Sequence, residues 1–77
     1  MAFIMIQVTS AKEIGKIARK VRKLQKMDQQ TAGSVANCGL TFVSHFENGK
    51  PTVQLEKALQ MLDALGVRVY LDVPPES

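Results

Sequence analysis

The side chains that most often carry catalysis are sparse in this 77-residue chain. His45 is the only histidine and Cys38 the only cysteine, so the sequence offers no Cys/His zinc cluster and no Ser-His or Cys-His pair. It has no phosphate-binding glycine loop, and its seven acidic residues are scattered without a paired-carboxylate pattern. We therefore expect a binding protein, not an enzyme, with neither a metal nor a cofactor.

The segment 40–47 carries side chains of the kinds that contact base edges in DNA. Val43 and Phe46 fall on the inward side of a predicted helix. The outer side carries Leu40, Thr41, Ser44 and His45. Hydroxyl and imidazole groups hydrogen-bond to base edges, and Leu40 or Phe42 suits a thymine methyl group. A solvent-exposed helix face would have a similar composition, so both interpretations stay open at this point.

Residues 28–48 predict two short helices separated by a tight turn. Asp28 is suited to cap the first helix, because a short side-chain acceptor satisfies the free amides there. Asn37 and Gly39 tolerate a sharply turned backbone, and Asn48-Gly49 ends the second helix. Two helices of about eight residues joined by a three-residue turn are typical of a DNA-reading helix-turn-helix.

The flanking helices are predicted from their apolar spacing. An amphipathic helix over 11–27 has Thr9 or Ser10 as its cap. Gly15 inside it marks either a close backbone approach or simple tolerance of glycine. A fourth helix follows a cap at Thr52 and stops at Gly66.

Both ends of the chain are predicted to form short strands. Phe3–Val8 is rich in β-branched and bulky residues, and Val67–Val73 alternates apolar and polar residues. The whole chain is expected to form one domain. It comprises an N-terminal strand at 1–9, a helical core at 10–66 with the helix-turn-helix at 28–48, a C-terminal strand at 67–73 and a tail at 74–77.

Charge is distributed unevenly along the chain. Seven of the ten basic residues lie between Lys12 and Lys26, with Glu13 the only acid among them. This asymmetry indicates either an anionic partner such as nucleic acid or a solvated helix face. The single cysteine fits a reducing compartment, and Phe3–Ile6 is too short to span a membrane. We expect a soluble, cytoplasmic protein.

Three stretches resemble the Cro/cI (XRE) helix-turn-helix family. They are Asp28-Gln29, the run Phe46-Glu47-Asn48-Gly49-Lys50-Pro51-Thr52, and Leu55…Leu59…Leu62-Asp63-Ala64-Leu65-Gly66-Val67. Within that family the chain is most similar to HipB-type antitoxins, and the resemblance spans residues 11–73. It implies a mainly α, lambda-repressor-like four-helix DNA-binding domain, with short N- and C-terminal strands forming a small dimer sheet.

The resemblance also implies roles for individual residues. It places Leu40, Thr41 and His45 at base edges, with Phe42 and Ser44 nearby. It places on DNA phosphates Gln29, Asn48, Lys50 and the amides at Thr52 and Val53. It further implies a partly buried ion pair between Arg22 and Glu47. Asn37 stands where the family usually has glycine, which is tolerable because asparagine visits the left-handed region. Leu40 and Phe42 make the reading face more apolar than is usual in the family.

These observations predict a sequence-specific DNA-binding repressor that acts as a homodimer on a palindromic operator. The resemblance implies an antitoxin that represses its own operon, with a HipA-like serine/threonine kinase toxin as its protein partner. A free-standing phage-type or host repressor is the alternative within DNA binding. A protein-interaction module that uses the same surface without DNA is the alternative from another class. The terminal strands are predicted to pair between subunits, with pairing within one chain as the competing arrangement.

Overall fold

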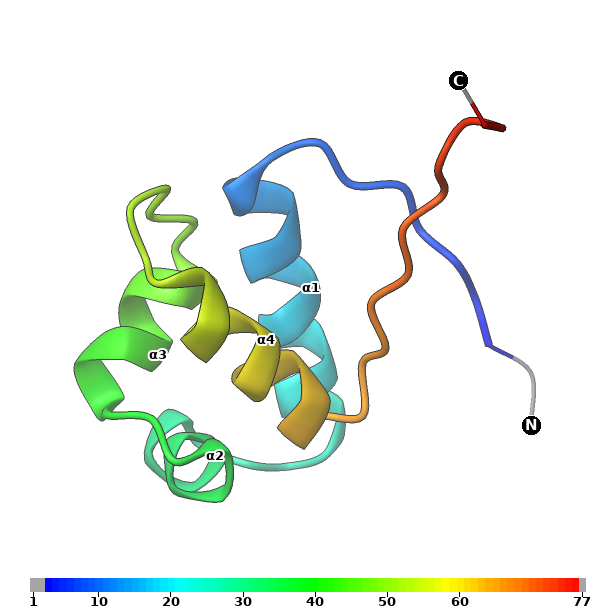
Figure 1. The fold of residues 1–77 in the computed structure, drawn as a ribbon. Helices are drawn as coiled ribbons and strands as arrows, with labels where there is room; N and C mark the ends of the chain where they lie inside the picture. The colour runs from blue at the N-terminus through cyan, green and yellow to red at the C-terminus, as the bar shows by residue number, and fades with distance from the viewer. Residues whose placement is uncertain (1–2, 77) are drawn as a thin grey trace.

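Four helices make up the ordered framework of the chain, and the computed structural model describes residues 3–76. They are α1 (Ala11–Leu24), α2 (Gln29–Ala36), α3 (Leu40–Glu47) and α4 (Leu55–Ala64). In Figure 1, α2 and α3 lie on one side of α1 and α4, and the segments before α1 and after α4 lie on the other. The predicted four-helix, mainly α domain is confirmed.

Side-chain caps begin the first two helices. The Ser10 hydroxyl accepts a hydrogen bond from the Glu13 amide at 3.1 Å, and Asp28 accepts one from the Thr31 amide at 2.7 Å. These bonds satisfy amides that have no partner within their helix. Of the two predicted caps for α1, Ser10 takes the role, while the Glu13 carboxylate accepts from the Thr9 amide at 2.8 Å.

All four helices end in a Schellman motif, in which a residue with positive φ reverses the chain. Gly49 and Gly66 take this conformation after α3 and α4, with φ of 80° and 79°. Lys26 and Asn37 take it after α1 and α2, with φ of 60° and 58°. The predicted helix over 11–27 therefore extends too far, because the chain reverses at Lys26 and α1 ends at Leu24.

α1 and α3 cross with their backbones in direct contact at Gly15. A Cβ atom at Gly15 would lie 2.8 Å from the carbonyl oxygen of Glu47 and closer still to that of Phe46. Of the two interpretations of Gly15, the structure therefore supports the close approach. Ala18 and Val43, both fully buried, continue the core from this crossing, and Met61 of α4 fills its centre.

The β-strands predicted at the two ends are not formed within residues 3–76 of the single chain. Phe3–Val8 and Val67–Val73 contain no strand and run as irregular chain outside the helices. A strand needs a neighbouring strand to satisfy its backbone amides and carbonyls, and residues 3–76 of one chain supply none to either segment. Ile4 is 87% exposed and Leu71 84% exposed, so these apolar side chains remain largely uncovered.

α4 begins later than predicted. Its N-cap is Gln54 and not Thr52, and the cap makes no side-chain hydrogen bond to the helix. Val53 packs against the core from the preceding turn, so the chain enters the helix after it. No helix among the described residues is long and apolar enough to cross a membrane.

Candidate nucleic-acid interface

The turn between α2 and α3 is held by buried contacts. The Cys38 amide donates to the Gly33 carbonyl at 2.7 Å, and the Cys38 thiol lies 3.5 Å from the Ala36 carbonyl and 3.9 Å from that of Lys57. Burial raises the pKa of this thiol, although the nearby charge of Lys57 opposes the shift. Cys38 is thus a structural side chain that fixes the angle between the two helices.

The exposed side of α3 carries four of the five residues predicted to read bases. Leu40 is 53% exposed and Thr41 is exposed, whereas Ser44 and His45 are half-buried. Hydroxyl and imidazole groups therefore stand beside an apolar side chain on one face of a helix of eight residues. That set can donate to or accept from base edges and contact a thymine methyl group.

Phe42 does not lie on this exposed side. It is half-buried against the core, and its ring stacks on that of Phe46 with the ring centres 5.7 Å apart. Phe42 thus packs partly against the core, and its contact with a base stays a prediction. The physical reason is its position on the helix, since residue i+4 from it is buried Phe46 and the two lie on one face.

A buried ion pair ties α1 to the end of α3. The Arg22 guanidinium donates from Nε to Glu47 Oε2 at 2.6 Å and from Nη2 to Glu47 Oε1 at 2.9 Å. Arg22 is 6% exposed and Glu47 5% exposed. The remaining guanidinium nitrogen donates to the Met27 carbonyl at 2.7 Å, so both charged groups are well satisfied.

Gln29, the first residue of α2, joins this pair. Its amide nitrogen donates to Glu47 Oε1 at 3.0 Å, so one carboxylate holds α1, α2 and α3 together. An amide group has two N–H donors, and the bond to Glu47 uses one of them. The second N–H is left for an acceptor outside the chain, with the side chain already held in position by Glu47.

The charge states of the network follow from these contacts. Burial raises the pKa of Glu47, but hydrogen bonds from Arg22 and Gln29 and the charges of Arg22 and Arg19 outweigh it, so the pKa lies below its ordinary value. The bond to Glu47 raises the pKa of Arg22. Both groups are therefore ionised at neutral pH, and the pair is a permanent part of the fold.

The residues predicted to contact phosphates are placed unevenly. Asn48 and Lys50 are exposed just beyond α3, with the Lys50 amide bonded to the His45 carbonyl at 3.0 Å. Thr52 and Val53 are different, because they belong to the turn before α4 and not to its first turn. The prediction that their amides form a helix N-terminus for a phosphate is wrong.

Sequence reasoning assigned no site to the basic side of α1, which the structure places beside this interface. Four residues form a shallow basic surface along the helix, together with Leu24: Lys16, Arg19, Lys20 and Lys23. We call the four basic residues the basic flank. The spacing of the basic residues in the sequence predicts that they share a helix, but only the structure shows the direction in which each side chain extends. Among the described residues, no cluster of three or more His, Cys, Asp or Glu side chains could hold a metal ion.

Two short helices joined by a fixed turn, with an exposed polar face on the second, define a helix-turn-helix protein. The family model described as Helix-turn-helix matches residues 19–71, and the chain belongs to this family. An uncharacterized HTH-type transcriptional regulator y4mF of Sinorhizobium fredii is 39% identical over 70 residues, which cover 91% of this chain and 92% of that protein.

Solved structures with the same fold include HipB. A chain of the HipA-HipB-O2-O3 complex is similar with a TM-score of 0.81 and 17% identity, covering 90% of this chain and 97% of that chain. A chain of the HipB-O4 20mer complex gives the same TM-score, identity and coverage. At this identity the likeness establishes the fold, which is the one that the resemblance to HipB-type proteins implied.

Proposed function

We propose that this protein is a sequence-specific, DNA-binding transcriptional repressor that reads the major groove with α3. The proposal is supported by the outer face of α3, which carries exposed Leu40 and Thr41 and half-buried Ser44 and His45 on a helix fixed by buried contacts at both ends. Because such a helix is already rigid, it loses little conformational entropy on binding, and its contacts with base edges can discriminate between base sequences. Membership of a family with a named transcriptional regulator supports the same function.

Phosphate contacts on either side of α3 would set its register on the duplex. Gln29 at the start of α2 and Asn48 and Lys50 after α3 are the groups proposed for this role. Such contacts position the protein and carry no sequence information of their own. Changes at Gln29 or Lys50 should therefore weaken operator and random DNA by similar factors.

The repressor is proposed to act as a homodimer. The terminal segments, α1 and α4 enclose an apolar groove of about 850 Å³, and its lining includes Ile4, Ile6, Leu59, Val69 and Tyr70. Exposed apolar area of this kind on a chain of 77 residues is covered most simply by a second copy. The termini lie away from α2 and α3, so a dimer formed through them leaves both reading helices free (Figure 1).

Pairing of Phe3–Val8 and Val67–Val73 between two copies would give each segment the backbone partner that one chain does not provide. A twofold dimer would set the two α3 helices about 34 Å apart, the spacing of successive major grooves on one side of DNA. Deletion of residues 67–77 should then abolish both the dimer and tight operator binding, as measured by light scattering and a mobility shift. A truncated protein that stays dimeric and binds normally would contradict this arrangement.

The biological role proposed is that of an antitoxin which represses its own operon in the cytoplasm, with a HipA-like kinase toxin as partner. The fold shared with the HipB chain of a complex that also contains HipA supports it. A free-standing repressor is the alternative, supported by the relative named as a transcriptional regulator.

One experiment separates these roles. The purified protein is tested in a mobility shift on its own promoter, with and without the product of the neighbouring gene. A specific shift that the second protein alters or tightens supports the antitoxin. A specific shift with no effect of that protein supports the free-standing repressor. No preference for the promoter over random DNA would contradict the repressor function itself.

A further inference from the structure

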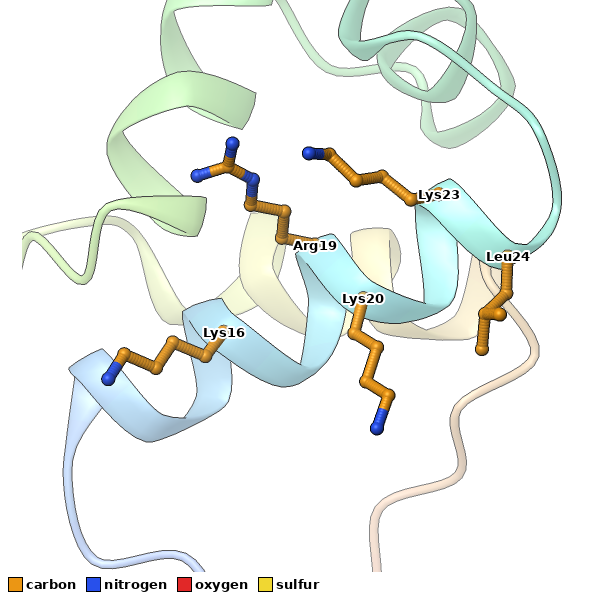
Figure 2. Close-up of a pocket in the computed structure, with 5 residues that line it drawn as sticks. All are labelled: Lys16, Arg19, Lys20, Lys23 and Leu24. Carbon is orange, nitrogen blue, oxygen red and sulfur yellow. The ribbon is translucent and has the colours of Figure 1, made fainter.

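The side chains of the basic flank leave α1 in different directions. Figure 2 shows Arg19 and Lys23 extending toward α2 and α3, whereas Lys20 extends away from them with Leu24, on the side of the C-terminal segment. Lys16 extends toward the start of α1. Arg19 and Lys23 are one helical turn apart, so these two side chains lie on the same face of α1.

No acidic side chain of the described chain neutralises these cations. The one ion pair within residues 3–76 is that of Arg22 and Glu47. Both oxygens of Glu47 are already occupied, Oε2 by Arg22 Nε and Oε1 by Arg22 Nη2 and the Gln29 amide. Arg19 and Lys23 therefore form no ion pair within residues 3–76, and their N–H donors are available to an anion from outside the chain.

The position of Arg19 and Lys23 relates them to the proposed DNA interface. Arg22 lies between them in the sequence and, through Glu47, contacts Gln29 at the start of α2. The charge of Arg19 reaches this carboxylate strongly enough to help lower its pKa. Arg19 and Lys23 thus extend to the side of α1 on which α2 begins and α3 ends, where a DNA backbone must pass if α3 lies in the major groove.

We propose that Arg19 and Lys23 contact phosphates of the DNA strand that runs past the start of α2, and that Lys16 and Lys20 do not. The inference rests on the proposed function and extends its phosphate-contacting surface from α2 and the loop after α3 onto α1. Arg19 suits such a contact because a guanidinium binds two phosphate oxygens at once. Lys23 adds a second point charge one turn further along the helix.

The test is the salt dependence of DNA binding, measured for matched variants of the full-length protein. The slope of log K against log salt falls by about 0.9 for each phosphate contact that is lost. Arg19→Gln and Lys23→Gln should each lower the slope by about this amount and weaken operator and random DNA by the same factor. Lys20→Gln, which removes one equal charge from the same helix, should leave the slope unchanged.

Conservative variants guard against an effect on folding. Lys23→Arg and Arg19→Lys keep the charge at each position and should retain the wild-type slope. Equal slopes for Lys20→Gln and Lys23→Gln would overturn the proposal, because the flank would then act only through its general charge. Unchanged DNA binding in Arg19→Gln and Lys23→Gln would also overturn the proposal. The anion bound by the two cations would then be an acidic protein surface and not DNA.

The outcome is separable from that of the repressor function. Wild-type protein that shows no preference for its promoter contradicts the repressor function, whatever the variants do. Wild-type protein that prefers its promoter, with the same slope in Arg19→Gln, Lys20→Gln and Lys23→Gln, contradicts only the role of Arg19 and Lys23.

Discussion

The helix-turn-helix side of the molecule and its terminal segments differ in how far their side chains are satisfied within one chain. Around α2 and α3 the contacts are made within the chain. The Arg22–Glu47 pair is bidentate, the turn between α2 and α3 is hydrogen-bonded to α2, and α1 approaches the backbone of α3 at Gly15. The terminal segments leave large apolar side chains such as Ile4 and Leu71 exposed. The helix-turn-helix side therefore has its contacts within one chain, whereas the opposite side carries the apolar surface that we propose a second copy covers.

The largest effect in this comparison is expected from the ion pair. Arg22→Met leaves the Glu47 carboxylate buried without its partner, and such a change costs about 3–5 kcal/mol of unfolding free energy. Lys20→Met on the exposed side of the same helix should change stability by no more than about 0.5 kcal/mol. Urea denaturation of both variants measures the difference. A loss below about 1 kcal/mol for Arg22→Met would place the pair among exposed ones.

A smaller loss, with an informative sign, is expected from Gly15→Ala. Alanine is favoured over glycine in a helix by about 1 kcal/mol, so an open position would become more stable. Here the new Cβ meets the carbonyl oxygens of Phe46 and Glu47, and forcing the helices apart should instead destabilise by about 1–3 kcal/mol. Thermal denaturation decides the sign. A gain in stability would show that α1 and α3 do not touch at this point.

Acid should destabilise the fold, in part through the Arg22–Glu47 pair. The pKa of Glu47 in the folded chain lies below its ordinary value of 4.5, so the unfolded chain takes up a proton first as the pH falls. The stabilisation is complete above pH 4.5 and is lost as the pH falls through the folded value. Hydrogen bonds from Thr9 and Thr31 lower the pKa of Glu13 and Asp28 in the same direction. A melting temperature that stayed constant from pH 6 to about pH 3 would contradict this linkage.

The smallest effect is expected at the end of α1. Lys26 holds a positive φ of 60° that costs a non-glycine residue about 1 kcal/mol or more. Lys26→Gly should therefore stabilise the protein slightly, by under about 1 kcal/mol, because the flexibility of glycine in the unfolded chain offsets part of the gain. Gly66→Ala is the matched reverse change, since φ is 79° there and nothing crowds the position. Gly66→Ala should destabilise the protein by about 1 kcal/mol. The two variants should therefore shift the melting temperature in opposite directions, and shifts of the same sign would contradict this explanation.

The sequence was sufficient where structure is decided locally. The cap at Asp28, the turn at Asn37 and the stop at Gly66 follow from residue types alone, and all three are present. It failed where the deciding partner is distant or absent. The terminal segments have strand-like sequences, yet a strand forms only when another backbone lies alongside it.

The candidate site shows the same division. Helical spacing was enough to place Thr41 and His45 on the outer side of α3, but not to show that Phe42 turns toward Phe46. The bond between Gln29 and Glu47 depends on how α2 crosses the end of α3, and no local pattern encodes that crossing. The ion pair itself came from a family resemblance and not from spacing, because its members are 25 residues apart.

In the function proposed, the outer face of α3 reads base sequence and the residues around it only position the helix on DNA. The most direct test compares Thr41→Ala with Lys50→Ala in binding to the protein's own promoter and to random DNA at fixed salt. Thr41→Ala should lower the specificity ratio, the affinity for the promoter divided by that for random DNA, by a factor equivalent to about 1–3 kcal/mol. Lys50→Ala should weaken binding to both DNAs alike and leave the ratio unchanged. A ratio that Thr41→Ala leaves untouched, with the same result for His45→Ala, would show that α3 is not the recognition helix.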